Sequence, residues 1–280
     1  MRGLFVGLMT LDCIYQAQRP PQANEKLVAQ AVMMAAGGPA TNAAVAFAAL
    51  GGKATIMASV GQHPVTTLLR DDMTQVGVTV ADLTPTRYEP PPISSIVVSH
   101  TGERAVISRN AVGLQVGQQV VDLVDLTDVD VVLVDGHQMI LSQQMAIQAN
   151  AVAIPVVVDA GSWKPGFEQV LSLATVVIAS ANFQPPDGTD SLTYLQNLGI
   201  PYIAITQGER PIVVSDQGNI SELTVSAVSV VDTLGAGDIF HGAFCYVWKD
   251  KFAAALHRAS QVAGRSCQSF GTRAWIADCD

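Results

Sequence analysis

The chain has 280 residues, of which 49% are hydrophobic and only 14% charged, and its formal net charge is −9. This composition excludes an intrinsically disordered chain, and the length allows a large core. The acidic balance argues against a nucleic-acid-binding protein, because such proteins usually present a basic face. Only a few basic residues could bind an anion locally, and each is more typical of an ordinary solvated charge: Arg104, Arg109, Lys164 and Arg210.

The cysteines and the apolar stretches bear on the compartment. Cys13, Cys245, Cys267 and Cys279 lack the spacing of a zinc site or a disulfide framework, and Cys245 and Cys267 fall in apolar helical stretches typical of a core. The N-terminus reaches Asp12 too soon for a signal peptide, and no stretch offers the roughly 18 uninterrupted apolar residues of a transmembrane helix. We therefore expect a cytoplasmic protein that has no membrane partner.

The first buried strand is predicted for Leu4–Met9, with Asp12 just beyond its carboxyl end. Ligands of open α/β sheets bind beyond the carboxyl ends of the strands, so Asp12 could accept hydrogen bonds from sugar hydroxyls. The alternative is an ordinary turn-forming residue. A polar loop and a β-compatible run, Leu27–Met34, follow.

The segment Gly37–Asn42 leads into an Ala-rich helix predicted for Ala43–Leu50. A pair of glycines lets a ligand approach the backbone closely, and the Asn42 amide offers a donor and an acceptor to a hydroxyl. The alternative is a plain turn before a helix, with Pro39 near the first helical position.

The rest of the first three quarters of the chain alternates strands with helices, which predicts a mostly parallel sheet flanked by helices. The predicted strands are Ala54–Val60, Val129–Val134, Pro155–Val158, Thr175–Ala179 and Tyr202–Thr206, and the predicted helices are Thr66–Val76, Ser142–Asn150, Phe167–Leu173 and Ser191–Leu198. Ser94–Ser99 and Ala105–Ser108 flank a short turn and predict a hairpin outside that series. His137 follows one of the strands and is interpreted as structural, because the sequence shows no partner for it.

The stretch Val231–Phe244, VDTLGAGDIFHGAF, combines a glycine pair with an apolar helical pattern. The glycines should lie at a helix N-terminus, where free N–H groups and the helix dipole favour an anion. Asp238 would then lie in the first turn, placed to accept a proton from a hydroxyl during phosphoryl transfer. The alternative is a Gly-rich turn with an ordinary first-turn acid.

This stretch, DTxGAGDxFxG, resembles the C-terminal signature of the ribokinase-like (PfkB) family of carbohydrate kinases. The GGxxxN segment at Gly37–Asn42 and the TxGxR turn at Thr206–Arg210 resemble two further motifs of that family, in family order. The resemblance implies one ribokinase-like domain over residues 1–280: a doubly wound α/β sheet with a small β lid formed by about residues 13–36 and 93–109. Such a lid has an exposed face and free edges, which a second subunit would cover, so we expect a homodimer through the lid.

The activity that the resemblance implies is phosphorylation of a hydroxyl on a small sugar, with ATP and Mg²⁺. Asp238 would be the general base, and the anion hole would be formed by Gly235, Ala236 and Gly237. Asp12, Gly38 and Asn42 would position the sugar, and Arg104 would lie near the transferred phosphate. Thr206, Gly208 and Gly271 would line the nucleotide side, and Asp232 would shape the anion loop.

Two departures from the family pattern limit the resemblance. Pro39 occupies a position where related sequences often have Lys or Asn, so the sugar is not identified. Many members carry Asn-x-x-Glu, a motif associated with magnesium, where this chain has Asn182-Phe183-Gln184-Pro185 and lacks the Glu. No metal ligand is therefore assigned.

Three other functions remain open. A nucleoside kinase of the same family would need a wider, more aromatic pocket, and this chain has only 6% aromatic residues. A non-catalytic ligand-binding protein could share the fold. A dinucleotide oxidoreductase is the least favoured, because no GxGxxG follows the first strand.

Overall fold

The computed structural model describes residues 1–109, 114 and 125–278. Within these residues the larger sheet has nine strands in the order β13-β12-β11-β10-β9-β8-β1-β4-β5. The strands from β5 across to β11 pair in parallel, and β12 and β13 add antiparallel pairs at one edge. Their bounds are β1 (Arg2–Val6), β4 (Lys53–Ala58), β5 (Val78–Asp82), β8 (Val131–Val134), β9 (Val156–Ala160), β10 (Val176–Ser180), β11 (Tyr202–Gln207), β12 (Arg210–Asp216) and β13 (Asn219–Leu223).

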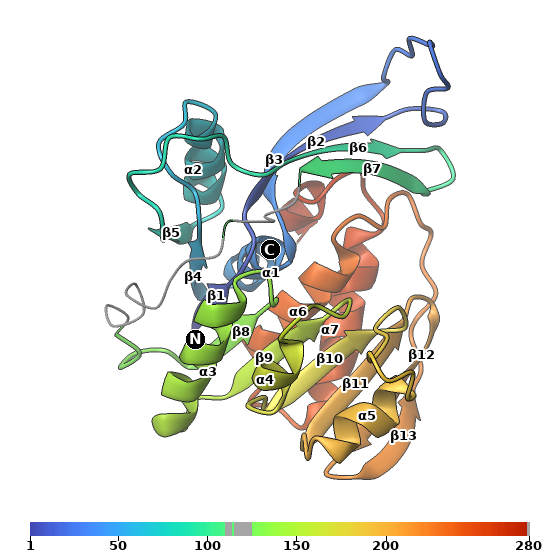
Figure 1. Ribbon diagram of the computed structural model, residues 1–280. Helices are drawn as coiled ribbons and strands as arrows, with labels where there is room; N and C mark the ends of the chain where they lie inside the picture. The colour runs from blue at the N-terminus through green and yellow to red at the C-terminus, as the bar shows by residue number, and fades with distance from the viewer. Residues whose placement is uncertain (110–113, 115–124, 279–280) are drawn as a thin grey trace.

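Helices cover both faces of this sheet (Figure 1), as the alternating sequence pattern predicts. They are α1 (Pro39–Ala49), α2 (Thr66–Gln75), α3 (Met139–Ala151), α4 (Phe167–Leu171), α5 (Ser191–Asn197), α6 (Ala236–Val247) and α7 (Phe252–Ser266). Phe5 of β1 packs into the core under α1, α6 and α7, whereas its neighbours Leu4 and Val6 pack into the core under α3 and α4. The central strands are therefore buried on both sides, which is why they form nearly continuous apolar runs in the sequence.

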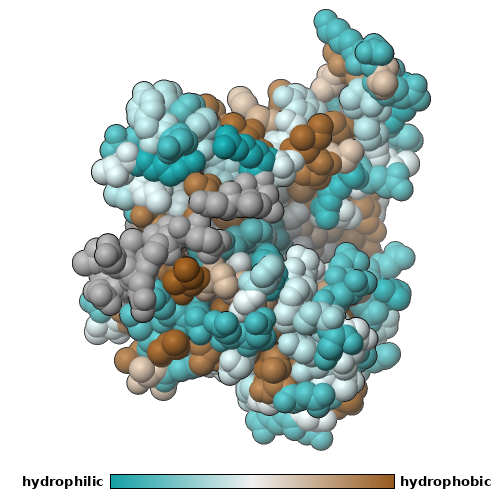
Figure 2. Space-filling view, viewed as in Figure 1, coloured by the Kyte–Doolittle hydropathy of each residue, from teal (hydrophilic) through white to brown (hydrophobic). Residues whose placement is uncertain are grey.

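A second sheet of four strands, in the order β3-β2-β6-β7, extends away from the larger one. It contains β2 (Thr10–Gln16), β3 (Ala31–Gly37), β6 (Ile93–Val98) and β7 (Arg104–Arg109). The predicted hairpin is confirmed, since β6 and β7 pair antiparallel. The surface shown in Figure 2 carries brown apolar areas on this small sheet, at the upper right, above a recess that separates it from the main body.

The predicted strand Leu4–Met9 was wrong at its end. β1 stops at Val6, and β2 begins at Thr10, so Asp12 lies inside the small sheet and does not follow the first strand. Met9 and Leu11 are both buried, so the apolar pattern continues while the chain passes from one sheet to the other. Hydrophobicity alone does not mark such a change of sheet.

Other element ends also differ: α1 begins at Pro39, before the predicted Ala43, and α3 begins at Met139, before the predicted Ser142. β3 begins at Ala31, four residues later than the predicted Leu27, because Val28 is 85% exposed and lies in the preceding loop. The short strands β5 and β13 were not predicted, since β13 is mostly exposed and β5 has a single buried residue, so neither gives a buried apolar run. Cys245 and Cys267 are buried, as predicted, and Cys279 lies outside the described residues. No helix among the described residues has the length and apolar character needed to cross a bilayer.

Candidate active site

The glycine pair of the C-terminal motif forms the start of α6. Gly235 is the residue before the helix and has φ 72°, in the left-handed region that favours glycine. The N–H of Ile239 donates to the Gly235 carbonyl at 2.8 Å, which closes the first turn. Asp238 lies in this turn, next to the N-terminal end of the helix dipole.

Asn42 of α1 reaches Asp238 across the interface between α1 and α6. Its Nδ2 donates to Oδ2 of Asp238 at 2.9 Å, although the residues are 196 positions apart. The two helices approach closely because Gly242 lies against the Ala43 carbonyl, where an added Cβ would come within 2.1 Å of the oxygen. A glycine on one helix therefore sets the distance between the two polar side chains.

The environment of Asp238 favours its protonated form. Burial and the negative charge of Asp159 raise its pKa to about 7, against the opposing effects of the Asn42 hydrogen bond and the His241 ring. A general base works best when its pKa lies near the working pH. This carboxyl group can therefore take up and release a proton near neutrality.

Asp12 lies beside the N-terminal glycine pair. An added Cβ on Gly37 would come within 1.8 Å of Oδ2 of Asp12, so this carboxylate needs the glycine. Its Oδ1 is buried, and no donor within the described part of the chain bonds it. Burial raises the pKa of Asp12 to about 6, with Ser94, Arg273 and Thr10 acting in the opposite direction. A buried acceptor without a donor is a natural position for a ligand hydroxyl.

On the other side of the first turn of α6 lies a cavity of about 270 Å³. Its walls come from the β11–β12 turn, the segment before the glycine motif, and α7. They include Thr206, Gly208, Val225, Val228, Ala236, Gly237, Phe240, His241, Ala263 and Gly264. This volume is near the lower end of the range for small-molecule sites, about 300 Å³. Ala263 and Gly264 leave room for a flat group against α7.

Three further residues of the sequence prediction lie around the loop before α6. Asp232 is buried, and its carboxylate accepts from Leu234 N and Gly271 N, each at 2.9 Å. Gly271 packs against Met33 and, among the described residues, is not part of the cavity wall. Arg104 of the small sheet donates to the Thr233 carbonyl at 3.0 Å, so its side chain reaches the same loop.

The sequence profile of the pfkB family of carbohydrate kinases matches residues 3–278. The chain belongs to this family. Proteins of the family are phosphotransferases that act on hydroxyl groups of sugars, so this chain is a phosphotransferase of the carbohydrate kinase class.

Individual relatives of this pfkB-family chain differ in their acceptors. It is 25% identical to an ATP-dependent ribose-1-phosphate kinase from Halopiger xanaduensis over 89% of this chain and 85% of that one. It is 26% identical to ketohexokinase from Mus musculus, over 94% of this chain and 95% of that one. Similarity at this level supports the reaction class and leaves the acceptor open.

Solved structures of the family share the fold at low identity. A microbiome-derived acarbose kinase matches with a TM-score of 0.83 at 18% identity, over 97% of this chain and 94% of that one. A nucleoside kinase from Burkholderia thailandensis, in complex with inosine, matches with a TM-score of 0.75 at 18% identity, over 99% and 96%. The two-sheet architecture of this pfkB-family chain is therefore shared by proteins that act on different compounds.

Sequence reasoning missed His241, although it lies inside the C-terminal motif of this pfkB-family chain. The ring is buried; its Nδ1 is 2.7 Å from the Gly237 carbonyl oxygen, and its Nε2 is 3.2 Å from the Ile178 carbonyl oxygen. Nε2 also lies 3.7 Å from Oδ1 of Asp159. His241 thus connects the first turn of α6 with the middle of β10 and with Asp159 near the end of β9. A polar residue at position i+4 from the second glycine was the available signal.

Asp135 and His137, at the end of β8, form a pair that the sequence did not predict. Nδ1 of His137 lies 3.2 Å from Oδ1 of Asp135, so the structure supplies the partner that the sequence did not show. Oδ2 of Asp135 accepts from Leu8 N at 2.9 Å and from Ala40 N at 3.1 Å. This carboxylate therefore holds the start of α1 against the end of β1.

Among the described residues, no group of three or more metal-ligating side chains gathers. Around the altered Asn-x-x-Glu position, Asn182 N donates to Ser180 Oγ at 2.9 Å and Phe183 is buried in the core. The segment is thus a turn fixed by packing, and it assigns no metal ligand.

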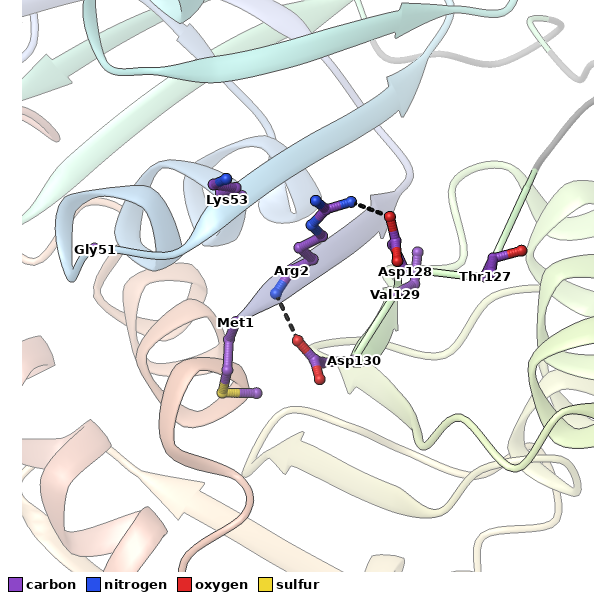
Figure 3. Close-up of a pocket in the computed structure, with 8 residues that line it drawn as sticks. All are labelled: Met1, Arg2, Gly51, Lys53, Thr127, Asp128, Val129 and Asp130. Carbon is purple, nitrogen blue, oxygen red and sulfur yellow. Dashed lines mark hydrogen bonds and ion pairs between the residues drawn. The ribbon is translucent and has the colours of Figure 1, made fainter.

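A different pocket lies at the amino-terminal edge of the large sheet, opposite the ends of the strands that carry the site (Figure 3). Three of its charged residues, Arg2, Asp128 and Asp130, are bonded to one another. The Arg2 side chain pairs with Asp128, and Arg2 N donates to Asp130 at 2.8 Å. Both partners of the ion pair are exposed.

Proposed function

We propose that this chain transfers the γ-phosphoryl group of ATP to a hydroxyl of a small carbohydrate. The observation that carries the proposal is the contact between Asn42 and Asp238 at the start of α6. The cavity lined by Thr206 and Gly208 also touches that turn through Ala236 and Gly237, and the buried Asp12 carboxylate lies beside Gly37, in the segment that leads to Asn42. An acceptor hydroxyl and a γ-phosphate would therefore meet beside Asp238.

In the proposed mechanism, Asp238 accepts the proton of the acceptor hydroxyl while the oxygen of that hydroxyl bonds to the γ-phosphorus. The bond between the γ-phosphorus and the oxygen that leaves with ADP breaks. The N–H groups of Gly235, Ala236 and Gly237 stabilise the negative charge of the transferred group; one such donor typically contributes about 3 kcal/mol. Arg104 adds positive charge near this loop through its contact with Thr233.

Other side chains position the two substrates. Asp12, Gly38 and Asn42 hold the sugar, and the free Oδ1 of Asp12 supports this role because it can accept from a hydroxyl. Thr206 and Gly208 lie against the nucleotide. Asp232 and Gly271 act together, since their hydrogen bond joins the anion loop to the segment after α7.

Magnesium would offset the charge of the triphosphate. Magnesium in such sites uses one or two carboxylates, with phosphates and water completing its shell, so it can enter with the nucleotide without a cage of protein ligands. Removing Mg²⁺ from the assay with EDTA should abolish turnover.

The decisive experiment measures ADP release with Mg²⁺ and ATP over ketoses, aldoses, phosphorylated sugars, sugar acids and nucleosides, for the wild type and Asp238→Asn. We expect turnover with one carbohydrate and a loss of at least 10³-fold in the variant. Turnover confined to a nucleoside would select the rival kinase. ATP binding without any turnover would favour a ligand-binding protein, and undiminished activity of Asp238→Asn would refute the mechanism.

We also propose a homodimer through the small sheet. Val32, Met34 and Val106 are exposed large apolar residues of β3 and β7, and Ile107 is 81% exposed. An exposed apolar sheet with free edges is commonly covered by a second subunit. Sedimentation velocity at micromolar concentration should show a dimer, and a monomer there would rule the proposal out.

A cytoplasmic location is part of the same proposal. The chain would use ATP, and its described cysteines are free thiols. Cell fractionation with a tagged chain would test it, and recovery from the periplasm or medium would contradict it.

A further inference from the structure

The Arg273 side chain joins its own segment to two regions that are distant in the sequence, α2 and the stretch that runs from β3 into α1. Its Nε and one terminal nitrogen donate to the two carboxylate oxygens of Asp72 in α2, at 3.4 and 2.8 Å. The same terminal nitrogen donates to the carbonyl of Ala36, the residue before the N-terminal glycine pair. The other terminal nitrogen donates to Oδ1 of Asn42 at 3.3 Å and to Oγ1 of Thr272 at 3.0 Å.

This arrangement uses the whole donor set of the guanidinium. An arginine has five N–H groups and no acceptor, and here acceptors lie at each of its three nitrogens. Asp72 balances its charge, and both side chains are largely buried. Arg273 is therefore placed to hold protein groups and has no N–H directed at a substrate.

The contact with Arg273 determines which way the Asn42 amide points. An amide has an acceptor oxygen at one end and a donor nitrogen at the other. Because Arg273 can only donate, Oδ1 must face it, and Nδ2 must then face Asp238, as the 2.9 Å contact shows. Without the arginine, the amide could rotate and present its oxygen to the carboxylate, which would repel an ionised Asp238.

The same ion pair also fixes the backbone beside the site. Ala36 N donates to Oδ2 of Asp72 at 2.8 Å, and the Ala36 carbonyl accepts from Arg273. Both polar groups of this residue are thus held, immediately before Gly37 and Gly38. Asn42, four residues beyond Gly38, is fixed from the backbone as well as from its side chain.

We propose that Arg273 is a positioning residue of the kinase: by donating to Oδ1 of Asn42, with Asp72 holding it in place, it orients the amide so that Nδ2 donates to Asp238. Arg273 itself touches no reacting atom. The inference deepens the proposed function and rests on it for its catalytic meaning, but the orientation of the amide can be measured without turnover.

The charge state of Asp238 is the readout, because a donated hydrogen bond stabilises the ionised carboxylate. Other groups also act on it: Asp159 from β9 and Asp135 after β8 raise its pKa, and His241 from α6 lowers it. These groups are unchanged in the variants below. Arg273→Gln also removes a positive charge, which by itself raises this pKa, so the charge-keeping Arg273→Lys is needed to report on the orientation of Asn42.

The first test is a ¹³C-carboxyl NMR titration of aspartate-labelled protein, in which the Asp238 signal is identified by its loss in Asp238→Asn. We expect the midpoint of Asp238 to rise by about one pH unit in Arg273→Gln and by a similar amount in Asn42→Ala. In the double variant the two shifts should not add, since both remove the same hydrogen bond. An unchanged midpoint in Arg273→Gln, or fully additive shifts, would overturn the proposal.

Two further variants serve as an alternative to Arg273→Gln and as a control. If Arg273→Gln does not fold, Arg273→Lys keeps the charge opposite Asp72, but one ammonium group cannot serve all the acceptors, so the midpoint should still rise. A Lys variant that folds and titrates like the wild type would refute the proposal. Arg258→Gln is the matched control, because Arg258 forms an exposed ion pair with Asp250 at 3.0 Å, and it should not move the midpoint.

Kinetics then connect the orientation with catalysis. With an accepted substrate, Arg273→Gln should lower kcat at pH 6 by about tenfold, leave KM for ATP unchanged, and recover most of kcat at pH 9. A loss of kcat that is equal at all pH values would show a merely structural role. If the wild type turns over no acceptor, the proposed function fails, and the NMR titration still decides the role of Arg273.

Discussion

Two aspartates near the carboxyl edge of the large sheet show opposite responses to burial. Asp135, after β8, is completely buried, yet its pKa is lowered to about 2, because the charge of His137 and hydrogen bonds from His137 and Leu8 outweigh the effect of burial. Asp238, at the start of α6, has a pKa raised to about 7, because burial and Asp159 outweigh the bond from Asn42. The two positions differ in their donors and in the charge of their neighbours.

Burial alone therefore does not decide whether a carboxylate stays ionised or exchanges its proton near neutral pH. Asp135 accepts from the backbone N–H groups of Leu8, Ala40 and His137, so its charge is stabilised and serves the structure. Asp238 has Asn42 as its side-chain donor and a like charge nearby, so its proton is exchangeable near neutral pH. One carboxylate stabilises the fold, and the other keeps the chemical property that the proposed reaction needs.

The largest effect on stability is expected when each of the two aspartates is replaced by asparagine, which removes its charge. Asp135→Asn should lower the free energy of unfolding by about 3 kcal/mol, because an amide NH₂ group would face N–H donors and the charge beside the His137 ring would be lost. Asp238→Asn should unfold at the wild-type temperature or above, since it removes a carboxylate in an unfavourable environment. Thermal and urea unfolding at pH 7 measure both, and equal destabilisation by the two changes would contradict the contrast.

A smaller effect is expected on the pH dependence of kcat. Asp238 must be ionised to accept a proton, so kcat should fall about tenfold for each pH unit below about 7, to about one hundredth at pH 5. Asp135 stays ionised over this range because its pKa is about 2, so the fold should persist. The measurement is kcat at saturating substrates from pH 5 to 9, with a melting curve at each pH. A flat profile down to pH 5 would exclude Asp238 as the base.

The smallest effect concerns the partner of Asp135. The pKa of His137 is raised, although burial and Lys164 oppose this, because Asp135 stabilises the imidazolium by its charge and a hydrogen bond. A raised folded-state pKa means that the stabilisation is complete below the unfolded value near 6.5 and is lost as the pH rises through the folded value.

His137→Asn should therefore cost about 2 kcal/mol of stability at pH 5.5, the usual contribution of a hydrogen bond to a charged group, and less at pH 9. Unfolding free energies of the wild type and variant at both pH values provide the check. A larger cost at pH 9 would reverse the sign and disprove the assignment of the pair.

Much of this fold was predictable from the sequence. Strands β8 to β11 are short apolar runs between polar or Gly/Pro residues, and burial on both faces explains why they could be recognised. The GGxxxN and GAGD segments each lie at a helix start, where the glycines meet a backbone requirement. The cavity beside Thr206 and Gly208 is on the side expected for the nucleotide, but its role there remains a prediction.

The rest depends on contacts that a single sequence does not encode locally. Asp12 was placed after the first strand, because the apolar pattern continues unbroken from β1 into β2. Gly271 was expected in the cavity wall, whereas its N–H is bonded to Asp232. Arg273 and Asp72 showed no signal, since each is an ordinary charged residue until the fold brings them together over 201 positions.

These long-range contacts also affect the order in which parts of the molecule can fold during synthesis. Arg273 reaches back 237 positions to Ala36, and Asp238 reaches back 196 positions to Asn42. During synthesis the N-terminal segments emerge first, and contacts between distant parts of a chain close slowly. The contacts that join Asn42, Asp238 and Arg273 are therefore completed only after the segment that carries Arg273 has been synthesised.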